Sequence, residues 1–172
     1  MKTIIGLSLL LVFLAGYAIP ETRRTPVAQA TPADWNPQSF WYYPWGRSGT
    51  HKGIDIFASA GTPVLAATSG LVVAQGYNSM GGNTVLVLGA KWRLHYYAHL
   101  QDTEAHILQW LKPAARIGTV GNSGNAQNKP AHLHYSILSL IPNPAHFDHK
   151  SPQAWKKMFY INPHQFLLSA SQ

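Results

Sequence analysis

Two short segments of this chain carry histidine and aspartate at spacings that suit metal chemistry. His132 and His134 are separated by one residue, so on a β-strand both imidazoles face the same side and can share one site. His51 and Asp55 flank Gly53, where a bend would bring the imidazole and the carboxylate to one point. Two imidazoles and one carboxylate make a three-ligand zinc site with the fourth position free, which is typical of catalytic rather than structural zinc.

A third segment, His95 to His99, alternates in the same way. If it is a regular strand, Tyr97 and His99 point into the same cleft as the histidine pair. The residues that would then face the opposite side are Leu94, Tyr96 and Ala98. Each segment by itself is weak evidence, because a lone His-x-His on a strand is more often surface or core decoration than a metal ligand.

Other chemistries are excluded or disfavoured by what the sequence lacks. The chain has no cysteine, which excludes disulfides, thiolate metal ligands and a cysteine nucleophile, so any metal must use histidine and carboxylate. Ser123 and Ser136 lie near the histidine segments, but no Gly-x-Ser-x-Gly elbow occurs. We interpret Ser123 as a turn residue.

Charge and composition limit the partners. Thirteen Lys and Arg against six Asp and Glu give a formal charge of +7, which fits an anionic partner such as nucleic acid, a membrane surface or an acidic wall polymer, or serves solubility alone. No basic run interleaved with aromatic residues occurs, so we expect no nucleic-acid partner. With 46% hydrophobic and 11% charged residues in 172, the chain predicts one folded domain.

The first 18 residues predict an export signal. Lys2 precedes an apolar stretch, Ile4–Ala18, that ends in small residues suited to cleavage. Cleavage after Ala18 would leave 12 basic against 6 acidic residues, a charge of +6. An uncleaved membrane anchor is the alternative, because residues 1–20 approach the length that spans a bilayer, and it would be the chain's only membrane contact. Residues 19–39, rich in Pro, Thr, Ala and Gln, predict a linker.

The rest of the chain, residues 40–172, predicts the folded domain, with its core at 51–140. Short apolar runs between turn signals predict seven strands: Gly53–Phe57, Pro63–Ala67, Gly70–Gln75, Asn83–Leu88, Arg93–Leu100, Arg116–Val120 and His132–Leu138. This spacing favours an all-β fold, an antiparallel sheet or sandwich with few short helical turns. We expect a short helix or turn at Glu104–Leu111, a helical turn at Pro152–Phe159, and a tail from Tyr160.

The motifs taken together resemble the LytM and lysostaphin type zinc endopeptidases, peptidase family M23. The segments that carry the resemblance are His51–Asp55, Gly61–Gly70, Gly82–Asn83, Tyr97–Leu100, Ile117–Gly124 and His132–His134, in the family's order. The resemblance implies a β fold with a substrate groove, one zinc held by His51, Asp55 and His134, and catalysis assisted by His99 and His132. Which of these two histidines is the general base stays open.

The resemblance also implies partners and a location. The substrate would be peptide cross-links of bacterial peptidoglycan. We expect Tyr97 and Asn83 either to support the metal ligands from outside or to contact the substrate. We expect an exported monomer, periplasmic or secreted, or membrane-anchored if the first segment is kept. The alternatives are a catalytically silent or occluded wall-binding regulator of other wall hydrolases, and a carbohydrate-binding β module whose metal is incidental.

Overall fold

A computed structural model describes residues 2–169 of the chain. Residue 1 and residues 170–172, at the ends of the predicted signal and of the predicted domain, lie outside this range. The strands are β1 (Ile54–Phe57), β2 (Pro63–Leu65), β3 (Gly70–Asn78), β4 (Gly82–Gly89), β5 (Arg93–Thr103), β6 (Trp110–Leu111), β7 (Arg116–Val120), β8 (His132–Ser139) and β9 (Tyr160–Ile161). The α-helices are α1 (Lys2–Ala18), α2 (Ala154–Lys157) and α3 (Pro163–Leu168), and single 3-10 turns lie at Pro32–Asp34, Gly46–Ser48, Ala90–Trp92, Gly124–Ala126 and Pro144–His146.

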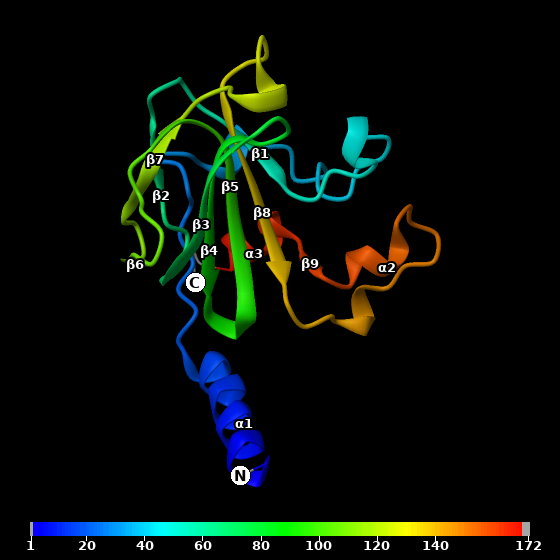
Figure 1. The fold of residues 1–172 in the computed structure, drawn as a ribbon. Helices are drawn as coiled ribbons and strands as arrows, with labels where there is room; N and C mark the ends of the chain where they lie inside the picture. The colour runs from blue at the N-terminus through cyan, green and yellow to red at the C-terminus, as the bar shows by residue number, and fades with distance from the viewer. Residues whose placement is uncertain (1, 170–172) are drawn as a thin grey trace.

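The strands form one antiparallel sheet, which confirms the predicted fold class (Figure 1). Its main path runs β1-β8-β5-β4-β3-β6, while β7 pairs with both β2 and β5, and β9 pairs with β8. Each of the seven predicted strands has a counterpart in this sheet. The central strands β8 and β5 therefore hold the histidine segments side by side.

Alternation along the strands separates a core face from a second face that carries the polar residues. In β8, Leu133 and Tyr135 are fully buried in the core, so His132 and His134 face the other way. In β1, Ile54 is buried in the same core, and Asp55 pairs with His134 across the sheet. The apolar residues of β1 and β8 thus position the polar ones on one surface.

The structure agrees with two local expectations and corrects a third. Residues 107–108 form a turn, as expected for Glu104–Leu111, and the short strand β6 follows within this range, where Leu111 is buried and pairs with Gly70 of β3. The tail from Tyr160 is ordered as β9 and α3, with Phe166 buried against the sheet. The helical turn expected at residues 152–159 is α2.

Part of the segment predicted as a linker packs onto the sheet. Val27 is buried and bridges Val64, and Trp35 is buried with its indole N–H donating to Nδ1 of His164 at 3.1 Å. The Leu65 amide donates to the Pro26 carbonyl at 2.9 Å. Composition alone predicted a linker because these apolar residues are isolated among Pro and Thr, yet their burial adds them to the core. The domain boundaries themselves stay a prediction.

Helix α1 extends away from the sheet (Figure 1). It touches the domain where the Trp92 indole donates to the Phe13 carbonyl at 3.0 Å. Among the residues that the structure describes, no helix is both long and apolar enough to cross a membrane. Cleavage of this helix as an export signal stays a prediction.

Candidate metal centre

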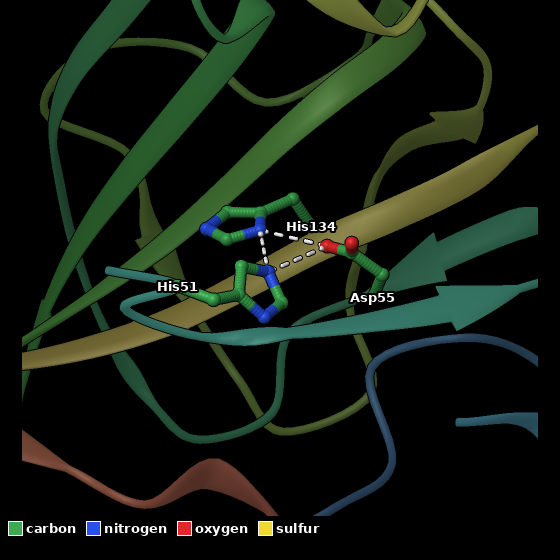
Figure 2. A group of neighbouring side chains, drawn as sticks. All are labelled: His51, Asp55 and His134. Carbon is green, nitrogen blue, oxygen red and sulfur yellow. Dashed lines mark hydrogen bonds and ion pairs between the residues drawn. The ribbon is translucent and has the colours of Figure 1, made fainter. Parts of the chain in front are cut away.

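Three side chains converge on the polar face of the sheet (Figure 2). His51 Nε2 lies 3.1 Å from Asp55 Oδ1 and 3.1 Å from His134 Nδ1, and the last two atoms are 2.8 Å apart. Zinc–ligand bonds of about 2.0–2.1 Å in a tetrahedral site place ligand atoms about 3.3 Å apart, so this donor triangle fits one zinc with small adjustments. Within residues 2–169 it is the one group of three or more His, Cys, Asp or Glu side chains close enough to share a metal.

The strand register brings these side chains together. Asp55 lies directly opposite His134, because β1 and β8 pair in antiparallel register. His51 reaches them from the loop before β1. Gly53 lies between, and a Cβ at this position would meet the Tyr135 carbonyl oxygen and the His134 ring, whose Cε1 would lie 2.9 Å away. The glycine therefore gives the His134 imidazole the space to lie against the start of β1.

The surroundings of the three donor side chains favour the protonation states that bind a metal. His51 Nδ1 lies 3.0 Å from the Ser39 carbonyl, and since a carbonyl only accepts, Nδ1 carries the proton and Nε2 keeps its lone pair for the site. The Trp45 indole stacks on the His51 ring at a centroid distance of 4.2 Å. Burial opposes ionisation of Asp55, but the interactions of its carboxylate with the adjacent His134 and His51 rings outweigh burial and hold the pKa of this carboxyl well below its usual range. Burial lowers the pKa of His134 and so favours its neutral, ligating form.

Two further imidazoles lie beside the triangle. The His99 ring centroid lies 5.0 Å from that of His132 and 6.0 Å from that of His134. His99 reaches this face because its backbone is left-handed, with φ of 63°, at a bulge where β5 has one residue more than its partner β4. A left-handed backbone costs a non-glycine residue about 1 to 2 kcal/mol, so the surrounding structure must hold it.

Both of these rings have Nδ1 against a backbone carbonyl. His99 Nδ1 lies 2.9 Å from the Ser123 carbonyl, and His132 Nδ1 lies 2.8 Å from the Pro130 carbonyl. Each Nδ1 therefore carries the ring proton, which leaves Nε2 free to accept one. Burial, aided by the neighbouring His134 and His132, lowers the pKa of His99 to about 4, so its ring is neutral at pH 7.

The residues of this site lie within a segment that matches a known protein family. The model of peptidase family M23 matches residues 49–148, which are more than half of the chain and include the three donor residues, His99 and His132. The chain belongs to peptidase family M23.

Several proteins of known sequence or structure match this chain over part of its length. Peptidoglycan DD-endopeptidase ShyC of Vibrio cholerae is 34% identical over 93 residues, which are 54% of this chain and 21% of ShyC. The catalytic domain of lysostaphin from Staphylococcus simulans matches 81% of this chain and 99% of that domain, with a TM-score of 0.63 and 23% identity. A zinc-containing peptidase from Vibrio cholerae matches 69% of this chain and 36% of that one, with a TM-score of 0.56 and 24% identity. The chain spans about a fifth of the length of the curated relatives it matches first, and the two solved structures show the fold.

Tyr97 lies elsewhere in the M23 domain than the alternation predicted. It is fully buried on the core face, where its hydroxyl accepts from the Ala67 amide at 2.9 Å and its ring packs on Tyr135. Tyr96 and Ala98 are instead on the face of the metal triangle, with Ala98 opposite His134. The prediction that Tyr97 and His99 share a face was wrong because the bulge at His99 breaks the two-residue period.

Asn83 is the remaining predicted residue. Its side-chain amide donates to the carbonyls of Leu100 and Gln101 at 3.2 and 3.0 Å, so it holds β5 just after His99. No hydrogen bond joins its described side chain to the three donors. The sequence missed two contacts of His51, the Ser39 carbonyl and the Trp45 indole, because neither a backbone oxygen nor an aromatic in a loop has a spacing signal.

Three other histidines have hydrogen-bond partners away from the metal triangle. His146 Nδ1 lies 3.1 Å from the Tyr160 carbonyl, and His95 Nδ1 lies 2.7 Å from the Tyr135 hydroxyl. Together with His164, which accepts from Trp35, they lie in packing or loop contacts outside the metal triangle.

Proposed function

We propose that this protein is a zinc-dependent endopeptidase that hydrolyses peptide cross-links of bacterial peptidoglycan. The observation that carries the proposal is the donor triangle of His51, Asp55 and His134, beside two imidazoles whose Nε2 atoms are free. Three protein ligands with an open fourth position are typical of catalytic zinc. One zinc per chain fits this arrangement.

The three ligands hold the metal with a favourable charge. Asp55, ionised at neutral pH, offsets part of the charge of a divalent ion, and the Ser39 carbonyl keeps the His51 lone pair directed at the site. When bound, zinc supplies Lewis acidity that polarises a carbonyl and lowers the pKa of water toward neutrality. The sheet supplies the rigidity, because Asp55 and His134 lie on paired strands.

His99 and His132 carry out the proton transfers of the proposed reaction. In each ring Nδ1 lies against a backbone carbonyl, so Nε2 is the nitrogen available to accept a proton from the attacking water. Once protonated, the same nitrogen donates to the oxyanion of the tetrahedral intermediate or to the leaving amine. We assign the two roles jointly, because both rings lie beside the triangle on the same face.

The relatives support the proposed substrate class. ShyC is described as a peptidoglycan DD-endopeptidase, and a neighbour in structure is the catalytic domain of an antimicrobial peptidase, lysostaphin. For this chain we propose wall peptide cross-links as substrate, reached by export and cleaved by a monomer. The basic charge of the chain would attract anionic wall material.

The test is release of soluble peptides from purified peptidoglycan by the chain lacking residues 1–18. We expect activity that chelator abolishes and zinc restores, and that His134→Ala loses. His146→Ala is the matched control, because His146 is an imidazole of the same domain outside the triangle. No release by a chain that binds one zinc would contradict the proposal and would favour an occluded regulator.

A further inference from the structure

The left-handed backbone of His99 is held by two turns that meet behind it. One is the turn that enters β4, where the carbonyl of Gly81 accepts from the His99 amide at 2.7 Å. The other turn contains Ser123, whose carbonyl accepts from His99 Nδ1. Both the main chain and the ring of His99 are thus tied to these turns.

Side chains lock the two turns together. The Ser123 hydroxyl donates to the Leu100 carbonyl at 2.7 Å and accepts from the backbone N–H of Asn83 at 2.9 Å. The Asn83 side chain donates to the carbonyls of Leu100 and Gln101. One serine hydroxyl therefore joins the entry to β4 with β5, and the Asn83 side chain binds the same stretch of β5.

The turns touch through two glycines. Gly82 and Gly124 both have left-handed backbones, with φ of 66° and 68°. A Cβ on Gly82 would collide with the backbone and hydroxyl of Ser123, and a Cβ on Gly124 would collide with the backbone of Gly82. The contact is therefore as close as main chains permit, and it leaves the Ser123 carbonyl little freedom to move away from His99.

We propose that Ser123 and Asn83 are positioning residues for His99: they hold its strained backbone at the bulge and keep its ring in the Nδ1–H tautomer with Nε2 facing the metal triangle. The consequence for catalysis rests on the proposed function. Neither residue contacts the three donor side chains through a hydrogen bond of the described structure, so they act on the proton-transfer step and leave metal binding intact. This reassigns Ser123, which the sequence predicted as a simple turn residue.

Kinetics of the full domain test the catalytic consequence. Ser123→Ala is expected to lower kcat about 10- to 100-fold, as loss of an orienting partner does, with KM and the zinc content unchanged. Asn83→Asp, which keeps the shape but removes the amide donors, is expected to lower kcat in the same way. Ser139→Ala is the matched control, because its hydroxyl also donates to a backbone carbonyl, that of Ile141, at 2.7 Å, but at the far end of β8.

Nitrogen-15 NMR of the histidine rings tests the structural part without any activity. We expect one Nδ1–H tautomer for His99 in the wild type and in Ser139→Ala, and a mixture of tautomers in Ser123→Ala. A single unchanged tautomer in Ser123→Ala overturns the proposal, and so does a kcat equal to that of Ser139→Ala. If the wild type releases no peptide, the proposed function fails, and the NMR result alone decides whether the two turns hold His99.

Discussion

Replacing His95 with asparagine is expected to make the protein less sensitive to acid. His95 lies on the core face of β5, fully buried, and its Nδ1 lies 2.7 Å from the Tyr135 hydroxyl. Burial lowers its pKa to about 4, an effect that the charge of Glu21 only partly opposes. The native protein therefore keeps this ring neutral at pH values where an unfolded chain would protonate it.

The sign and size of the effect follow from proton uptake. Above pH 6.5 the ring is neutral in both states, so His95 has no effect on the pH dependence. Between pH 6.5 and about 4 the unfolded chain takes up a proton that the native state does not, so the free energy of unfolding decreases as pH falls. With a native pKa of about 4 against 6.5 unfolded, the loss between pH 7 and pH 4.5 is about 2 kcal/mol.

The assay is urea unfolding of both proteins, with chelator present so that metal binding does not contribute. His95→Asn keeps a polar group near Tyr135 but does not titrate, and its smaller volume lowers stability by an amount independent of pH. We therefore expect the stability deficit of the variant at pH 7 to shrink by about 2 kcal/mol at pH 4.5. A deficit that is the same at both pH values would refute the account of His95 as a buried neutral ring.

Three further changes test the metal site and the charge. Asp55→Asn removes the anionic donor. Loss of a residue that only hydrogen-bonds a metal ligand lowers zinc affinity by roughly 10- to 100-fold, and we expect a larger fall here, measured by competition with a chromogenic chelator. An unchanged affinity would contradict the assigned ligand. Gly53→Ala places a methyl group against the His134 ring, so zinc affinity should fall while the far-ultraviolet circular dichroism spectrum is retained; full affinity would show that this contact is not needed. Added salt should raise KM on peptidoglycan more than it lowers kcat, because salt would screen the proposed attraction between the basic chain and anionic wall material; a KM independent of salt would exclude this attraction.

The sequence predicted those parts of the site that depend on a regular strand. Leu133 and Ile54 alternate with the polar residues of β8 and β1, and the two-residue period alone puts His132 and His134 on one face. The convergence of His51 and Asp55 also followed from their spacing around Gly53. These features are local, so the strand period and the spacing around Gly53 are sufficient to predict them.

The features that were missed depend on contacts between distant segments. The bulge that turns His99 toward the metal triangle lies where two turns, near Gly82 and Ser123, contact β5. Val27 is buried against the sheet, yet its sequence neighbours, Pro26 and Ala28, form no alternating apolar pattern that would predict this burial. Such packing partners have no fixed sequence spacing, and period and composition therefore do not predict them.

The most direct test of the central claim is titration of the metal-free chain with zinc while peptide release from peptidoglycan is measured. If His51, Asp55 and His134 hold one catalytic zinc, activity rises in proportion to added zinc and stops rising at one equivalent per chain. Full activity without zinc, or activity that appears only beyond the first equivalent, would contradict the claim.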